Sequence, residues 1–362
     1  VTASSAGDGY MALDAVRFGG GKGNVARRPS GDIISNQRSV NENATAEVQR
    51  AGSDTIIHTW KLSGKPRYME GSRYYLQYAG MPDTLVYSLN RNKNDYNDDY
   101  QSRGEWVNYL MGTAESDGGT AGIKGLGLPI DLSLAFHTDA GVTPDDSIIG
   151  TLGIYSTAAG GGRFPDGTSR MASRDLTDII QTQIVDDISL LFNPEWTRRG
   201  LWDRSYSEAR KPNVPAMLLE LLSHQNQGDQ RYGLDPRFRF HVSRAVYKGI
   251  LRYLSYADGR DYVVQPLPVK GMAVLPLDGK RVKLSWLPVE DPLEPSAHPT
   301  GYRIYKRTGD NGFDNGTDLT ENSAVIELDH YDTVYSFRVT AFNEGGESFE
   351  SETVAAGVKK ES

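Results

Sequence analysis

The sequence changes its pattern at a short proline-containing junction, and this change divides the chain into parts with different folds. Before the junction, Gln265-Pro266-Leu267-Pro268, residues 56–262 alternate strand-like apolar runs with stretches of helical periodicity. After it, residues 264–358 hold only short runs in which apolar and polar residues alternate. The first pattern is typical of a mainly parallel sheet with helices on both faces, and the second favours a β-sandwich. We therefore expect an α/β domain over residues 56–262 and an all-β domain over residues 264–362.

The composition excludes several kinds of site and partner. The 362 residues include 47 acidic and 39 basic side chains, for a net charge of −8, and no cysteine. The lack of cysteine excludes disulfides, thiolate metal ligands and cysteine nucleophiles. An acidic balance argues against a nucleic-acid partner, which needs a basic face. No stretch approaches the roughly 18 apolar residues of a membrane helix, so we expect no transmembrane segment. The sequence leaves the oligomeric state open.

The all-β segment carries the marks of a known module. Its clearest alternating strands lie at residues 282–286, 302–306 and 335–339. Trp286 sits on an early strand, and Tyr335 occupies the position of a tyrosine corner. The whole segment resembles a fibronectin type III domain. Such a module seldom carries chemistry, so we expect it to space, pack or bind.

Local patterns in residues 56–262 predict the elements around a site. Helices are expected at residues 69–78, 103–111, 173–191 and 238–253, and strands at residues 84–88, 129–137 and 214–222. Ser173 is placed to cap the N-terminus of its helix. Segment 94–100 is acidic but lacks the glycine and the terminal glutamate of an EF-hand, so we interpret it as a solvated loop. The glycine run 160–162 lacks the lysine of a phosphate loop and is interpreted as a hairpin.

Two ionisable residues stand where apolar strands end or run through the core. In such sheets, ligands collect at the carboxyl ends of the strands. His137 leaves the strand 129–137 and could ligate a metal, or could be a buried histidine bonded to backbone. Glu220 lies inside an apolar strand, where burial raises a carboxyl pKa into the range of a general base or acid. Its alternative is a buried ion pair with an arginine from residues 198–199 or 204–210.

The order of several short motifs resembles the zinc-dependent N-acetylmuramoyl-L-alanine amidases, which cut the bond between muramic acid and L-alanine in peptidoglycan. The resemblance spans roughly residues 66–256. The matching pieces are Arg103 with Asn108, His137-Thr138-Asp139-Ala140 with Asp in place of the family's Asn, the strand 150–155, the helix start 173–177, Arg199-Gly200, and the strand and turn 215–226.

The resemblance implies an amidase-like fold, a zinc cofactor and a set of site residues. His137 would be a zinc ligand, and Glu220 would activate a zinc-bound water and pass its proton to the leaving amine. Glu70 falls where the family has its carboxylate ligand; alternatively, it is a first-turn glutamate that complements the helix dipole. Substrate contacts would come from Arg199, His224 and Asn226, although His224 also fits a structural loop role. The partner would be peptidoglycan or another polysaccharide, and the location extracytoplasmic: periplasm, cell surface or secreted.

One family motif is missing. The first histidine ligand, within Asp-Pro-Gly-His-Gly, has no counterpart, and the context of His58 does not match it. Either the site is degenerate and binds glycan or peptide without cutting it, or the motif precedes Val1. Residues 14–18 look like the last strand of a golvesin-type β domain, found as an insert in secreted Bacteroidetes proteins described as xanthan lyases. On that interpretation, residues 1–55 are the remnant of an upstream β domain and a long loop. We rank three functions: zinc amidase, non-catalytic polysaccharide binding, and polysaccharide lyase last, because amidase-like strands do not support a lyase.

Overall fold

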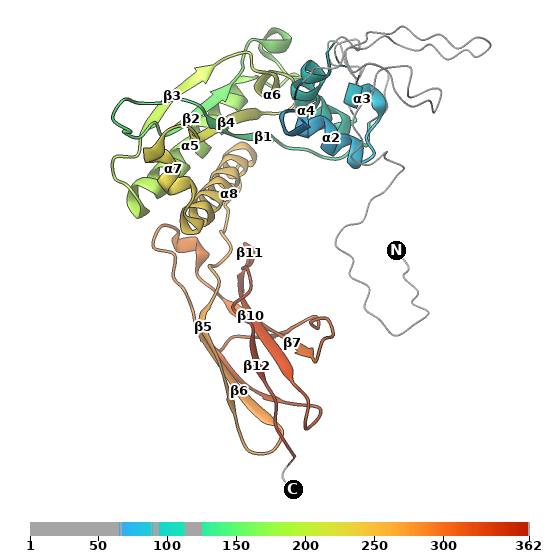
Figure 1. Cartoon of the computed structure of the whole chain (residues 1–362), viewed down its shortest axis with the longest axis vertical. Helices are drawn as coiled ribbons and strands as arrows, with labels where there is room; N and C mark the ends of the chain where they lie inside the picture. The colour runs from blue at the N-terminus through green and yellow to red at the C-terminus, as the bar shows by residue number, and fades with distance from the viewer. Residues whose placement is uncertain (1–64, 66, 88, 90–93, 113–124, 361–362) are drawn as a thin grey trace, which may run out of the picture. The chain divides into compact units, whose positions relative to one another are not determined.

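The computed structural model describes residues 65, 67–87, 89, 94–112 and 125–360 (Figure 1). The hypotheses about residues 1–55 and His58 lie outside these residues. The described residues up to 185, together with residues 192–239, form one compact unit, and residues 186–191 with residues 240–360 form a second. The second unit therefore contains most of a long helix besides the C-terminal sandwich. Across the described part of the chain, no helix has the length and apolar character needed to cross a membrane.

The first unit is built on a four-stranded mixed sheet in the order β1-β4-β2-β3. Its strands are β1 (Ser133–Asp139), β4 (Ala216–Ser223), β2 (Thr151–Tyr155) and β3 (Arg198–Asp203). The outer pairs, β1 with β4 and β2 with β3, are parallel, as expected, whereas the central pair of β2 with β4 is antiparallel. Strands 129–137 and 214–222 are confirmed in position, and β3 was not expected from its pattern because its residues are mostly polar.

Helical elements precede, separate and follow the strands of this sheet. They are η1 (Arg67–Glu70), α2 (Gly71–Tyr78), α3 (Asp83–Tyr87), α4 (Asp95–Met111), η2 (Ala159–Gly162), α5 (Met171–Leu191), α6 (Ser207–Arg210), α7 (Gln227–Gly233) and α8 (Pro236–Asp258), with α5 and α8 divided between the two units. The predicted helices at residues 69–78, 103–111, 173–191 and 238–253 are therefore confirmed.

Two predictions in this region are wrong. Residues 84–88 were expected to be a strand, but Asp83–Tyr87 form the helix α3, whose adjacent Leu85 and Val86 are both buried in one cluster with Leu76. The acidic segment 94–100 was expected to be a loop. Instead, Asn94 caps α4 by accepting hydrogen bonds from the backbone N–H groups of Tyr96 and Asn97. The acidic side chains of the first turn stabilise the helix because they interact favourably with the positive end of its dipole.

Helix α5 packs on one face of the sheet and is held there by polar contacts. The Gln181 side chain donates to the backbone oxygens of Thr151 and Arg199, both at 2.8 Å. Ser173 lies inside the helix rather than at its cap, and its hydroxyl accepts a hydrogen bond from the Ala216 N–H. A Cβ at Gly153 would collide with Thr177 Cγ2, so glycine is what allows this close approach. The opposite face of the sheet is thereby left for the side chains that alternate with Gly153.

The second unit contains a β-sandwich. One sheet has the order β5-β6-β9, and the other has the order β11-β10-β7-β8 with β12 also paired to β10. The strands are β5 (Lys270–Pro276), β6 (Arg281–Leu287), β7 (Gly301–Thr308), β8 (Thr317–Leu319), β9 (Ser323–Glu327), β10 (Tyr335–Asn343), β11 (Gly346–Glu347) and β12 (Val354–Ala356), with a short η3 (Pro295–Ala297) before β7. Trp286 stacks edge-on against Tyr302 in the core. Tyr335 is fully buried, and its hydroxyl accepts a hydrogen bond from the His330 N–H at 3.0 Å, as a tyrosine corner does.

Candidate functional site

Strand pairing brings His137 and Glu220 together. In the parallel β1–β4 ladder the two residues are direct partners, so their side chains leave the same face of the sheet. In the adjoining β4–β2 ladder, Glu220 pairs with Leu152 while Leu219 pairs with Gly153, which faces α5. His137 and Glu220 therefore lie on the face opposite α5. The sequence argument placed both at one edge of the sheet, and the register makes them neighbours.

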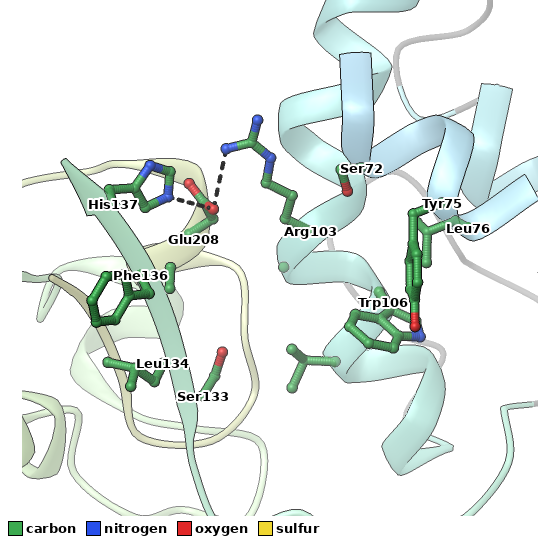
Figure 2. A pocket seen from close by; sticks show the side chains of 13 residues that line it. Ser72, Tyr75, Leu76, Arg103, Trp106, Ser133, Leu134, Phe136, His137 and Glu208 are labelled. Carbon is green, nitrogen blue, oxygen red and sulfur yellow. Dashed lines mark hydrogen bonds and ion pairs between the residues drawn. The ribbon is translucent and has the colours of Figure 1, made fainter. Parts of the chain in front are cut away.

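A hydrogen-bonded row of charged side chains extends from His137 to helix α4 (Figure 2). His137 Nε2 lies 2.9 Å from Glu208 Oε1, on α6. Arg103 on α4 donates to the same Glu208 oxygen at 3.3 Å and to Asp99 Oδ2 at 3.2 Å. Asp99 Oδ1 in turn accepts a hydrogen bond from the Arg73 N–H at 2.7 Å. Glu208 thus joins a strand and a helix through one carboxylate.

The surroundings shift three pKa values in this row. The hydrogen bond to Glu208 raises the pKa of His137, and the Glu208 charge adds to the effect against the opposing desolvation. Although burial works against it, the His137 hydrogen bond and the charges of His137 and Arg103 hold the pKa of Glu208 below its usual range. Burial raises the pKa of Glu220, and nearby Asp139 raises it further, in spite of His137 and Arg199. Neighbouring groups with separated pKa values are what proton transfer requires.

Glu220 keeps one oxygen without a partner. Its Oε2 is buried and has no hydrogen bond from any described residue. Among the arginines considered as ion-pair partners, in residues 198–199 and 204–210, Arg199 instead contacts Asp139 Oδ2 at 2.5 Å and acts on Glu220 only through its charge. A buried carboxylate oxygen without a donor costs free energy unless the group is protonated or meets a ligand. Glu220 is therefore available for chemistry in a way that a paired carboxylate is not.

His224 also lies near this cluster. It follows the end of β4, its backbone N–H donates to the Asp139 carbonyl oxygen at 2.9 Å, and its Nδ1 lies 3.1 Å from Thr138 Oγ1. The side chain is exposed. His224 thus borders the ends of β1 and β4, where it can reach a bound molecule.

A groove of about 370 Å³ adjoins the charged row, a size within the usual range of ligand sites. Residues 133–137 of β1, with Glu208, line one side, and α2 and α4 line the other (Figure 2). On the helical side, Tyr75 and Trp106 form an edge-to-face aromatic pair with ring centroids 6.1 Å apart. Tyr75 is 58% exposed. The groove therefore has aromatic rings on one wall and the hydrogen-bonding charged groups of His137 and Glu208 on the other.

Asn226, expected to contact substrate, instead holds the fold together. It is fully buried and caps α7, where its side-chain oxygen accepts the Asp229 N–H at 2.9 Å. Its amide donates to Thr143 Oγ1 at 2.9 Å and to the Ser147 carbonyl oxygen at 3.0 Å. A side chain engaged at both ends of its amide and closed to solvent has nothing to offer a ligand.

The residues described do not fit the expected zinc ion. Glu70 is buried and pairs with Arg73 at 2.5 Å, so the carboxylate expected to ligate zinc is held in an ion pair on the α2 side. His137 Nε2, the other expected ligand, is engaged by Glu208. Among residues 65, 67–87, 89, 94–112 and 125–360, no three His, Asp or Glu side chains gather as a metal site would require. We therefore derive no chemical step through zinc.

Glu208 is the site residue that sequence reasoning missed. It lies in a four-residue helix, Ser207–Arg210, whose sequence has no periodicity to mark it. Its contacts reach 71 residues back to His137 and 105 residues back to Arg103. The sequence offered one weak signal: Glu208 is an acidic residue between Arg204 and Arg210, and a histidine such as His137 often pairs with a carboxylate.

The comparisons with known proteins bear on the C-terminal segment. The sequence model of the fibronectin type III domain matches residues 267–356, which span both sheets and the tyrosine corner. Residues 267–356 form a fibronectin type III domain. This confirms the expected sandwich. No curated protein matches the chain.

Solved structures also show likenesses over about a quarter of the chain. The FN1–FN3 domains of chicken CNTN1 are 21% identical, covering 26% of this chain and 31% of that chain with a TM-score of 0.23. The third fibronectin III domain of human KIAA0343 is 15% identical, covering 28% of this chain and 89% of that chain with a TM-score of 0.24. A myokine structure is 22% identical over 26% of this chain and 100% of that chain, with a TM-score of 0.23.

The Glu208→Gln variant tests the His137–Glu208 pair through its pH dependence. Because the folded-state pKa of His137 is raised, the pair stabilises the fold fully below the ordinary histidine pKa of about 6.5 and loses that contribution as pH rises through the raised value. We expect Glu208→Gln to lower the His137 pKa, measured by NMR titration of its ring proton. It should also remove about 1 kcal/mol more stability at pH 6 than at alkaline pH, where only the contact of Glu208 with Arg103 is lost. The exposed Glu195→Gln is the matched control; an unchanged His137 titration would contradict the pairing.

Proposed function

We propose that the first unit binds a polysaccharide of the peptidoglycan type in the groove beside His137. The observation that carries the proposal is the arrangement of the two walls: the Tyr75–Trp106 pair faces Glu208 and His137 across one groove (Figure 2). Arg103, on the same helix as Trp106, reaches over to Glu208. A sugar ring has an apolar C–H face and a polar rim of hydroxyls. Aromatic rings pack on the first, and charged planar groups hydrogen-bond the second.

The groove suits sugar rings in general and does not distinguish one polysaccharide from another. We infer peptidoglycan from the ordered motifs that resemble the amidases. The fibronectin type III domain is compatible with polysaccharide binding, because such a module can act as a spacer or as a further binding module in the same chain. A cell-wall partner implies an extracytoplasmic location.

Replacing Tyr75 by alanine tests this proposal. Its ring is 58% exposed, so truncation should leave the fold intact, while loss of the aromatic contact should weaken binding to purified peptidoglycan by roughly fivefold, or about 1 kcal/mol. Co-sedimentation with the insoluble polymer measures the affinity. Tyr68→Ala is the matched control, because Tyr68 is 83% exposed on the neighbouring η1 and does not line the groove. Equal affinities of the two variants, or no binding by the native chain, would overturn the proposal.

A second candidate function is hydrolysis of an amide bond in the same polymer, favoured by Glu220. Its raised pKa, its unpartnered buried oxygen and its position beside His137 suit a general base. Glu220 would take a proton from a water molecule as the hydroxide adds to the amide carbonyl. It would then return the proton to the leaving nitrogen as the C–N bond breaks. This candidate requires the release from peptidoglycan of peptides that begin with L-alanine.

A further inference from the structure

A second pocket in the first unit is lined by an unusual number of basic side chains. Its volume is about 330 Å³, and it shares no lining residue with the groove beside His137. Arg163, Arg170, Arg210 and Lys211 line it, with Phe164 and Glu105 among the remaining residues. We call it the arginine pocket. Four cations meet one carboxylate there, in a protein whose net charge is negative.

Arg170 is a buried cation that lacks a carboxylate partner. Its residue is only 4% exposed, and it precedes the first turn of α5. Within the described chain, Nε and Nη1 have no hydrogen-bond partner, and Nη2 makes only a long contact of 3.4 Å with the Pro212 carbonyl oxygen. The guanidinium lies 4.5 Å from the centre of the Phe164 ring, which offsets part of its desolvation. A buried guanidinium with two free donors is costly unless an anion meets it.

The neighbouring charges add to this cost rather than relieve it. Arg210, at the end of α6, is close enough to Arg170 for the two like charges to repel, and burial together with Arg210 lowers the pKa of Arg170. No hydrogen bond or ion pair of the Arg210 side chain is found in the described part of the molecule. Lys211 is paired with Glu105 at 2.5 Å, so the single carboxylate of the pocket is already engaged. Two guanidinium groups are thus left facing a polar cavity without a counter-charge.

The backbone beside Arg170 is a run of three glycines in the left-handed region. Gly160, Gly161 and Gly162 have positive φ angles of 58°, 65° and 84°, a conformation that favours glycine. A Cβ at Gly160 would stand 3.9 Å from Arg170 Nε, an ordinary contact distance, so the positive φ angles and not a lack of space account for glycine here. The run, which we interpreted as a hairpin, instead belongs to the short helical turn η2 (Ala159–Gly162) and lines the pocket through Gly160.

We propose that the arginine pocket binds a phosphoryl group. A guanidinium presents its donors as a fork that matches the oxygens of an oxyanion. Two unpaired guanidiniums carry two positive charges, which a phosphate dianion neutralises and a single carboxylate ligand does not. The cavity is larger than a phosphate ion, and Phe164 offers an apolar wall, so there is space for an organic group attached to the phosphate. The source is either free phosphate or a phosphorylated small molecule. The inference does not depend on the proposed function of the groove.

Calorimetric titration of the full chain with inorganic phosphate, glucose 1-phosphate and acetate tests the proposal. We expect saturable binding of both phosphates and none of acetate; tighter binding of glucose 1-phosphate identifies a phosphorylated molecule as the ligand, and equal affinities identify free phosphate. Arg210→Gln should weaken phosphate binding by at least about tenfold, since it removes one charged fork. The control is Arg204→Gln, an exposed arginine of the same segment outside the pocket.

Arg170→Met gives a second readout, because removal of an unpaired buried cation should preserve or raise the melting temperature in phosphate-free buffer while abolishing the stabilisation by phosphate. If this variant fails to fold, Arg210→Gln decides. No saturable binding of either phosphate up to about 10 mM, a Kd far weaker than paired guanidiniums provide, would overturn the proposal. So would phosphate binding by Arg210→Gln equal to that of the native chain. Acetate binding as tight as phosphate would overturn the phosphoryl assignment.

Discussion

The Asp229→Ala variant is expected to lose about 3 to 5 kcal/mol of stability in the first unit. Asp229 is fully buried in α7, and its two carboxylate oxygens accept three backbone N–H groups: Ile149 at 2.9 Å, Gly150 at 3.3 Å and Ser223 at 2.8 Å. These bonds tie the chain entering β2 to the end of β4. Alanine would leave three buried donors unsatisfied, and each would keep its full desolvation cost.

Hydrogen exchange followed by mass spectrometry measures this effect in the unit where it arises. Exchange of the β4 amides, residues 216–223, should accelerate by roughly 150- to 4,000-fold, while exchange of β10 in the fibronectin type III domain stays unchanged. Asp186→Ala removes an exposed aspartate from α5 and should change exchange only slightly. Protection of β4 within threefold of the native chain would show that Asp229 does not hold these strands together.

The Glu220→Gln variant should lose at least about 100-fold of any amide hydrolysis by the native chain, because an amide cannot accept the proton of the attacking water. Glutamine keeps the size of the side chain, so the β1–β4 ladder and the groove should remain. Peptidoglycan binding should therefore stay within about twofold of the native value, separating chemistry from recognition. The measurement is the rate at which peptides with N-terminal L-alanine appear, together with the co-sedimentation affinity.

The pH profile distinguishes a base from a merely structural glutamate. A base must be ionised, so the rate should rise with pH through the raised pKa of Glu220, and this rise should be missing from any residual activity of Glu220→Gln. The matched control is Glu195→Gln, an exposed glutamate of the same unit. Turnover that survives Glu220→Gln, or a native chain that releases no peptide, would contradict hydrolysis and leave binding as the function.

The local pattern of apolar residues predicted most helices and strands of the first unit. It failed at the start of α4, where polar and acidic residues resemble those of a loop. Residues 173–191 and 214–222 carried enough apolar periodicity to be assigned, and α5 and β4 are found there. In segment 94–100, acidic and polar residues hid a capped helix, because the same residues that favour a solvated loop also favour a first turn. Strand β3 escaped notice because its apolar residues are few.

The candidate site was predictable only in part. The placement of His137 and Glu220 at one edge of the sheet follows from where apolar strands end. The roles expected for Asn226 and Glu70 rested on motif order, which does not report burial: one is a helix cap, and the other is held by Arg73. Arg199 and His224 both lie at the strand ends, but Arg199 is engaged with Asp139.

The sequence by itself determined that a fibronectin type III sandwich follows a helix-and-strand unit, because apolar period, turn residues and the tyrosine corner are properties of neighbouring residues. Only the tertiary structure decided which charged groups meet. The pairing of His137 with Glu208, the unpartnered oxygen of Glu220 and the two guanidiniums without counter-charge depend on strand register and on helices brought together across the chain. Such contacts form between residues far apart in the sequence, and no local pattern encodes the distance between them.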